Sequence, residues 1–206
     1  MASLPRALEG AERLDAVARR IERMAEAVVP VGPIRRVLRG EWLGHPLHPA
    51  LVHLPTALWP AALFFDLLSR TDQGGVVPVQ IAYYAILLGL VVAAAAAVTG
   101  LADWLDIKPE KPARKLGLAH MLLNLTAVAL FALNLWLRAQ LPVTTVTLPL
   151  PHLGLTVLGN LLLAVSGYLG GRLVYQYGIS VARHSEPKLR RRAEAAGAKV
   201  PAEEKG

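Results

Sequence analysis

Four long runs of apolar residues set the pattern of this chain. They cover residues 49–68, 77–101, 116–137 and 153–171, and each is close to the roughly 20 residues that an α-helix needs to cross about 30 Å of hydrocarbon. The second run carries no charge and is rich in small residues, which let neighbouring membrane helices approach closely. We therefore predict an all-α protein, an integral membrane four-helix bundle with up-down connectivity.

A different periodicity precedes the first run, within residues 1–39. Leu14, Val17, Ile21, Met24 and Val28 recur at spacings of three and four with arginines and glutamates between them, which is the pattern of an amphipathic α-helix. We expect this helix to lie on the membrane surface or on the bundle itself. A short coiled-coil seam between two protomers, and hence a homodimer, is the alternative.

Composition supports the membrane class and excludes several kinds of site. Of the 206 residues, 54% are apolar and 18% are charged, and the mean hydropathy is +0.41, as expected for a membrane protein. Cysteine is absent, which excludes thiolate zinc sites, iron–sulfur clusters, attached c-type haem and thiol nucleophiles. No hydrolase or nucleotide-binding motif is visible, so no enzyme class is indicated beyond a possible redox role.

Lysine and arginine are unevenly distributed around the four runs. Of the 22 in the chain, all but Arg70 and Arg138 lie on the side that holds both termini and the loop between the second and third runs. The positive-inside rule predicts that this side is cytoplasmic. The basic tail, residues 182–206, is then expected to meet anionic lipids rather than nucleic acid, for which no binding motif is visible.

The ends of the runs on the predicted cytoplasmic side carry polar residues that are unusual in membrane helices. His53 and His120 each lie four residues inside their runs, so both are expected about 6 Å below the helix start. Amides are costly against lipid, so a face of the third run that contains them should point into the bundle. That face consists of His120, Asn124, Ala127, Phe131 and Asn134.

Two imidazoles at one depth on facing helices suit the iron of a b-type haem. We expect His120 to be one axial ligand and His48 or His53 to be the other. The remaining candidate cofactor contacts are Asn124, Trp104, Arg172 and Tyr175. A zinc, iron or copper ion is the competing chemistry, with candidate ligands His45, His48, His53, His120 and Asp103.

The predicted outer ends of the runs hold fewer polar residues. Asp66 lies close in sequence to Arg70, and we expect these two to form an ion pair at a helix end. His152 follows the segment LPLP in the outer loop, where we expect it to be solvated.

Four motifs along residues 40–181 resemble those of a bacterial family of predicted membrane proteins of unknown function. They are WLGHPLHP at 42–49, TGLADW at 99–104, GLAHMLLN at 117–124 and GGRLVYQYGI at 170–179. The resemblance implies a compact four-helix membrane domain, similar in arrangement to membrane b-type cytochromes, and so a haem. Some members carry aspartate in place of His53 and histidine in place of Arg172, which favours His48 over His53 as a ligand.

These patterns support one functional hypothesis and two alternatives. The first is a haem b or metal-binding membrane protein that exchanges electrons with a redox partner or senses redox state. The second is a non-redox scaffold whose buried His and Asn residues only hold the helices together. The third is a permease, which four spans without a visible inverted repeat make less favourable.

Overall fold

All regular secondary structure in the described part of the chain is helical, which confirms the predicted class. The computed structural model describes residues 12–29 and 31–179, so the basic tail lies outside the described residues. The helices are α2 (Glu12–Val28), α3 (Pro33–Leu38), the short 3-10 helix η1 (Glu41–Leu43), α4 (Leu47–Leu68), α5 (Val76–Leu105), α6 (Pro112–Arg138) and α7 (Leu150–Tyr175).

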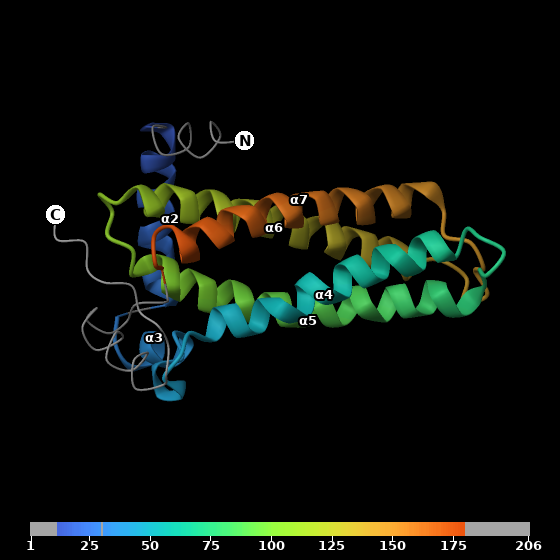
Figure 1. Cartoon of the computed structure of the whole chain (residues 1–206), viewed down its shortest axis with the longest axis horizontal. Helices are drawn as coiled ribbons and strands as arrows, with labels where there is room; N and C mark the ends of the chain where they lie inside the picture. The colour runs from blue at the N-terminus through green and yellow to red at the C-terminus, as the bar shows by residue number, and fades with distance from the viewer. Residues whose placement is uncertain (1–11, 30, 180–206) are drawn as a thin grey trace, which may run out of the picture.

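Helices α4 to α7 lie side by side in an up-down bundle (Figure 1). Each is long and apolar enough to cross a membrane, which agrees with the four predicted spans. The most extensive contacts join α4 to α5, α6 to α7, α5 to α6 and α4 to α7, so α4 and α6 are diagonally opposite. We call the end of the bundle that lies against α2 the α2 end, and the opposite end, formed by residues 69–75 and 139–149, the loop end.

The two hairpins α4–α5 and α6–α7 are related by a pseudo-two-fold axis along the bundle. Three pairs of side chains meet across the diagonal between α4 and α6, and the two members of each pair are 72 positions apart in the chain. The pairs are His48 with His120, Trp59 with Phe131, and Asp66 with Arg138. The bundle is therefore a tandem repeat of one helical hairpin.

Glycines on the other two helices follow the same symmetry. A Cβ added at Gly89 of α5 would lie 2.7 Å from Cδ1 of Trp59, and one added at Gly159 of α7 would lie 2.7 Å from Cε2 of Phe131. The two rings stack with centroids 4.2 Å apart and an interplanar angle of 22°. Each ring is thus held between its partner and a glycine, and the stack fills the centre of the bundle.

This packing predicts that Gly89→Ala and Gly159→Ala each destabilise the protein by about 1–3 kcal/mol, because the added methyl group has no room. The matched control is Gly154→Ala on α7, where a Cβ would meet nothing within 4 Å; alanine there should be neutral or stabilise by up to ~1 kcal/mol. Thermal unfolding in detergent, followed by loss of the monodisperse fraction, measures the difference. Equal effects at Gly89, Gly159 and Gly154 would contradict the packing of the aromatic layer.

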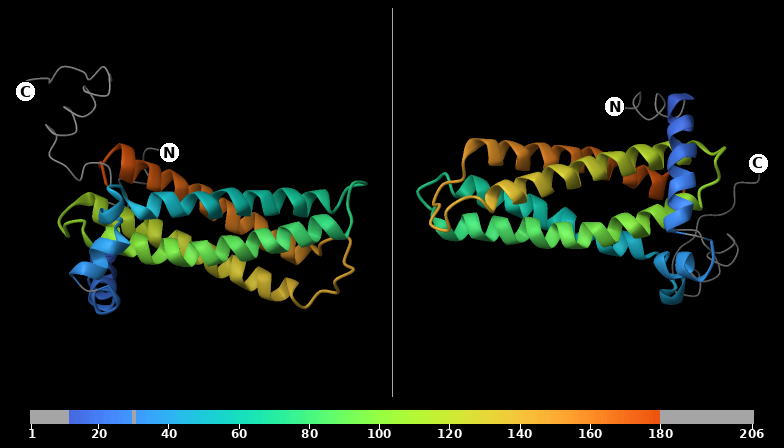
Figure 2. Two further views of the ribbon diagram at one scale, coloured as in Figure 1. Left: turned by 90° about the horizontal axis from the view of Figure 1, so that it is seen from below. Right: turned by 180° about the vertical axis from the view of Figure 1, so that it is seen from behind.

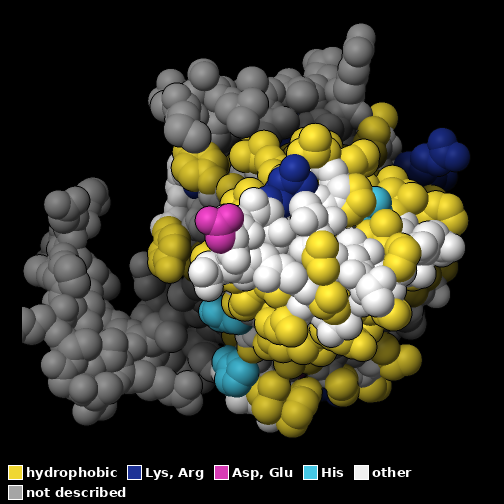
Figure 3. All heavy atoms as spheres, turned by 90° about the vertical axis from the view of Figure 1, so that its right-hand side faces the viewer, with side chains coloured by type: hydrophobic (Ala, Val, Ile, Leu, Met, Phe, Trp, Pro, Cys, Tyr) yellow, Lys and Arg dark blue, Asp and Glu magenta, His cyan; other side chains and the backbone are white. Residues whose placement is uncertain are grey.

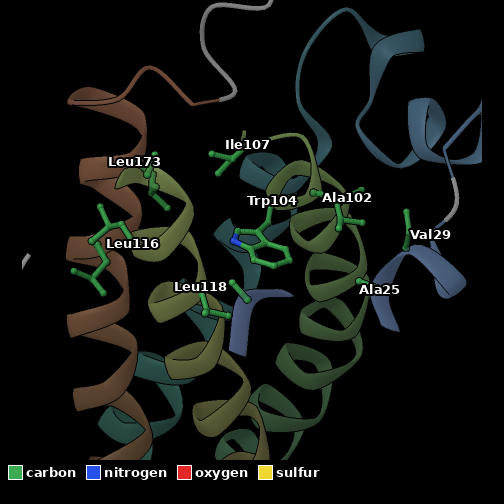
Figure 4. Packing of buried hydrophobic residues seen from close by; sticks show 12 residues of the cluster. Ala25, Val29, Ala102, Trp104, Ile107, Leu116, Leu118 and Leu173 are labelled. Carbon is green, nitrogen blue, oxygen red and sulfur yellow. The ribbon is translucent and has the colours of Figure 1, made fainter. Parts of the chain in front are cut away.

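Helix α2 crosses the long axis of the bundle at the α2 end (Figures 1 and 2). Its buried residues Ala18 and Ala25, together with Val29 just after its end, belong to the same apolar cluster as Trp104 of α5 and Leu118 of α6. Figure 4 shows Ala25 and Val29 beside α5, and Trp104 projecting between the helices. Part of the amphipathic helix therefore packs on the bundle, one of the two placements expected from the sequence.

Candidate functional site

The bundle has one polar layer near each end, separated by the aromatic stack of Trp59 and Phe131. The layer at the loop end is a closed ion-pair network. Arg138 donates from Nη1 to Oδ1 of Asp66 at 2.9 Å and from Nη2 to Oδ2 at 2.5 Å. Thr156 Oγ1 donates to Asp66 Oδ2 at 2.8 Å, and Arg138 Nε donates to Asn134 Oδ1 at 3.1 Å. Each nitrogen and oxygen of the Asp66–Arg138 pair has a partner within this layer. Both ring nitrogens of the buried His152, whose backbone oxygen accepts from Asn134 and Thr156, lack a hydrogen-bond partner among the described residues.

Two expectations for the loop end are wrong. Asp66 pairs with Arg138 of the diagonal helix and not with Arg70, whose Nη1 donates to the backbone oxygen of Leu148 at 2.7 Å. His152 is only 9% exposed and lies inside α7, because α7 begins at Leu150, earlier than the apolar run suggested. Tertiary packing, which sequence proximity does not reveal, decides both cases.

The layer near the α2 end contains a pair of histidines on the diagonal helices. The ring centroids of His48 in α4 and His120 in α6 are 6.4 Å apart, and the ring planes are nearly perpendicular, at 86°. Both rings are partly buried. The predicted meeting of imidazoles from two separate spans near one end of the bundle is therefore present, with His48 as the partner of His120.

Each ring is anchored to the backbone of the next helix in the same way. His48 Nδ1 lies 2.8 Å from the backbone oxygen of Ala96 in α5, and His120 Nδ1 lies 2.8 Å from that of Ser166 in α7. A carbonyl oxygen can only accept, so Nδ1 must carry the proton and donate it. A neutral imidazole with a protonated Nδ1 keeps its lone pair on Nε2. Both histidines thus have the tautomer that ligates a metal through Nε2.

A glycine lies against each ring one turn beyond its carbonyl partner. A Cβ added at Gly100 would lie 2.8 Å from Cε1 of His48, and one added at Gly170 would lie 2.9 Å from Cε1 of His120. The motifs TGLADW and GGRLVYQYGI both contain one of these glycines. Only a residue without a side chain leaves room for the ring, so these glycines set the positions of the histidines.

Asn124 lies one turn after His120 on α6 and approaches the free side of its ring. Its Nδ2 lies 3.1 Å from His120 Nε2 and donates to the backbone oxygen of His120 at 3.0 Å. An amide N–H directed at Nε2 agrees with a lone pair on that nitrogen. The pseudo-symmetric position in α4 is Val52, so Asn124 makes the two halves of the layer different.

The other predicted histidine and acidic candidates are not brought to this layer. His45 and His53 are exposed, and their Nδ1 atoms contact the nearby backbone oxygens of Pro46 and Ala50. Asp103 is buried at the end of α5 with Arg39 Nε 4.0 Å from its Oδ1. Within the described residues, no group of three or more His, Cys, Asp or Glu side chains is arranged to hold a metal ion.

The remaining candidates belong to the bundle end. Trp104 is 3% exposed, donates from Nε1 to the backbone oxygen of Arg114 at 3.0 Å, and is covered by the Arg114 guanidinium at 3.7 Å from the ring centroid. This role in packing accounts for its burial. Arg172 Nε donates to Gln176 Oε1 at 2.6 Å, and Tyr175 is 92% exposed. These two line a shallow surface groove on α7 rather than the histidine layer.

The tandem repeat is the feature that the sequence analysis missed, and a recurrent spacing could have revealed it. An aromatic residue follows the histidine after eleven positions in both halves, from His48 to Trp59 and from His120 to Phe131. Two glycines recur at the same spacing, at 89 and 100 and again at 159 and 170. A search restricted to inverted repeats overlooks a parallel repeat of this kind.

Comparison with known proteins gives a family but no characterised relative. The family model described as "Predicted membrane protein (DUF2231)" matches residues 44–183. The match begins just before α4 and extends past α7, so it contains the whole bundle and excludes α2 and α3. No curated protein and no solved structure matches the chain.

Proposed function

This chain belongs to the DUF2231 family of predicted membrane proteins, and we propose that it is an integral membrane protein that binds one haem b for electron transfer or redox sensing. His48 and His120 are the residues that would hold it. The observation that carries the proposal is the pair of diagonal histidines, each with Nδ1 on a backbone carbonyl and its lone pair on Nε2. In His120 this lone pair faces Asn124 Nδ2 at 3.1 Å, so iron would have to replace that donor. A bound haem supplies the one-electron chemistry of its iron.

The separation of the two rings equals that of two imidazoles on one metal ion, and it also lies in the range of a direct edge-to-face contact, which is how the rings meet here. Metal–imidazole bonds are about 2.0–2.1 Å long, and the centre of an imidazole ring lies roughly 1.1 Å from its nitrogen. Two ligands on opposite sides of one ion therefore have ring centres about 6.3 Å apart, against 6.4 Å here. Two nitrogens without further protein ligands suit an iron whose other positions are filled by a porphyrin better than a bare zinc or copper ion.

Small residues border the pair, and two of them, Gly100 and Gly170, already lie against the histidine rings, so a haem would have to widen this part of the bundle. The neighbouring helices carry Ala96 and Gly100 on α5, and Ser166 and Gly170 on α7, at the level of the rings. Small residues leave backbone, not bulky side chains, beside the histidines. The next layer, with Trp59 against Phe131, is filled by stacked aromatic rings. The proposal therefore specifies one haem per chain, at the α2 end.

Purification after expression with ample haem tests this function. We expect a reduced-minus-oxidised difference spectrum of b-type and one haem per chain, with iron content equal to haem content. Excess zinc or copper in the same sample would instead favour a metal-ion site. A protein without a Soret band, which also takes up no haem on titration, would leave the structural scaffold as the explanation of the histidine layer.

A pair of adjacent glycines gives a matched test of the ligand geometry. Gly170→Ala should weaken haem binding by about 10-fold or more, because a methyl group at that position displaces the His120 ring, and changes next to ligands typically cost 10–100-fold. Gly171→Ala is the control, since a Cβ there would meet nothing within 4 Å. Haem titration followed at the Soret band measures both. Equal affinities would argue against His120 as a ligand in the position described.

The orientation in the membrane is part of the proposal. The lysines and arginines gather at the α2 end, and the face at the loop end shows mainly apolar and uncharged side chains (Figure 3). The positive-inside rule then supports cytoplasmic termini in a bacterial inner membrane, with the haem near the cytoplasmic side. A redox partner would approach from that side.

The variant Asp72→Cys tests this topology. Its single cysteine is treated with a membrane-impermeant reagent from outside intact cells.

A further inference from the structure

Helix α2 leaves one strip of apolar side chains outside the bundle. Val17, Met24 and Val28 are 41%, 65% and 71% exposed. They follow one another at spacings of seven and four, so they lie on one side of the helix. The strip is adjacent to the face formed by Ala18 and Ala25, which packs on the bundle. The apolar surface of α2 therefore extends beyond the face that packs on the bundle.

Exposed aliphatic side chains also follow α2 in the chain. Val31 is 80% exposed, and Ile34 and Val37 of α3 are 59% and 55% exposed. Arg35 of the same short helix turns inward, where its Nη2 donates to the backbone oxygen of Val29 at 2.8 Å. A buried arginine beside exposed aliphatic residues reverses the usual arrangement in water, which indicates that the outward side of α3 does not face water alone.

The position of α2 along the bundle identifies what covers the strip. Its apolar cluster includes Ala102 and Leu105 near the end of α5, and Ala113 and Leu116 near the start of α6. These residues mark the boundary where the apolar runs 77–101 and 116–137 give way to charged sequence. Because the four spans fix the hydrocarbon layer, a helix that crosses them at this level lies in the headgroup region (Figure 2).

Charged side chains occupy the remainder of the exposed surface of α2. Arg19, Arg20 and Arg23 are exposed, while Glu22 is engaged by Arg114, with Nη2 and Oε1 2.7 Å apart. Arg20 lies about 60° around the helix from Val17 and so borders the strip, where it can meet anionic headgroups, whereas Arg19 lies about 160° away. A second copy of the chain fits less well, because stable protein interfaces bury about 800 Å² per partner over 20–30 residues, whereas the exposed aliphatic residues named here are six.

We propose that the strip of α2 and the exposed aliphatic side chains that follow it insert into the headgroup and upper acyl region of the protein's own membrane, so that α2 is a lipid-facing anchor lying parallel to the surface. The anchor lies outside the matched family domain and is independent of haem binding. It holds α2 at the membrane surface beside the end of the bundle where Trp104 and Arg114 pack.

Single spin labels test the proposal, and the absence of native cysteine makes them straightforward. Met24→Cys and Val28→Cys, each labelled with a nitroxide in the full chain, are reconstituted in vesicles of phosphatidylethanolamine and phosphatidylglycerol. We expect both labels to be more accessible to oxygen than to a water-soluble nickel chelate. Arg19→Cys, on the polar side of the same helix, is the matched control and should show the reverse preference.

Two results would overturn the anchor. Labels at Met24 and Val28 that are as accessible to nickel as the label at Arg19 would place the strip in water. Dipolar broadening at Met24 that disappears when labelled protein is diluted with unlabelled protein would show that a second copy covers it. Because both labelled positions are exposed, the substitutions are expected to leave the fold intact, which monodisperse elution in detergent verifies.

Discussion

Arg138→Met is expected to destabilise the protein by about 3–5 kcal/mol, because it leaves the Asp66 carboxylate buried without a counter-charge. Asp66 is 0% exposed and Arg138 is 4% exposed, and both lie inside the apolar bundle. Asp66→Leu should lower the stability by a similar amount, since it leaves the Arg138 guanidinium buried without a counter-charge. Thermal unfolding in detergent measures the loss. Arg70→Met is the matched control at the loop end, where the side chain is exposed and makes a single bond to a backbone oxygen.

The pseudo-two-fold symmetry makes a sharper prediction about the same pair. Asp66 and Arg138 occupy equivalent positions in the two hairpins, so exchanging them, as Asp66→Arg with Arg138→Asp, keeps opposite charges in contact across the diagonal. We expect the exchanged protein to recover a large part of the stability lost in either single variant. The recovery is partial because Thr156 and Asn134 come only from the second hairpin. An exchanged protein no more stable than the single variants would contradict the symmetry argument.

His120→Gly and His48→Gly are each expected to weaken haem binding by at least about 100-fold, more than loss of a residue beside the ligands. His45→Ala and His53→Ala are the matched controls, since both side chains are exposed and away from the layer; they should bind haem as the unaltered protein does. Haem content after purification and titration at the Soret band measure the effect.

Added imidazole separates a ligand from a structural residue. If His120 ligates iron, free imidazole entering the space left by His120→Gly should restore a large part of the haem absorbance. A histidine that only joins α6 to α7, through its contacts with Ser166, would give a different result. The variant would then lose thermal stability without any change in bound haem, and imidazole would have no specific effect.

The bundle and its inward face were predictable from the sequence. The four runs of about 20 apolar residues indicate the spans. The cost of placing amides against lipid indicates which face of the third span points inward. Ala127, Phe131 and Asn134, which continue the predicted face of His120, are all 0% exposed. The cluster at the loop end was not predictable, because Asp66 has a nearer arginine in sequence than the one 72 positions away that it contacts.

The choice between His48 and His53 shows why the site itself was only half predictable. Both belong to the first two turns of α4, and five residues at 100° each place their side chains about 140° apart around the helix. The two side chains therefore cannot both face the bundle axis, and the sequence does not show which one does. In the structure His48 faces the axis, where its ring lies against Gly100 and its Nδ1 donates to the carbonyl of Ala96. Both of these residues belong to another helix, α5.

The EPR spectrum of the ferric, haem-loaded protein is the most direct test of joint ligation by His48 and His120. If both imidazoles held the haem iron, ring planes at 86° would give the strongly anisotropic low-spin signal of a perpendicular pair. We expect that signal at one iron per chain, with its loss in both histidine variants. A high-spin, five-coordinate iron, or a protein that binds no haem at all, would contradict the account.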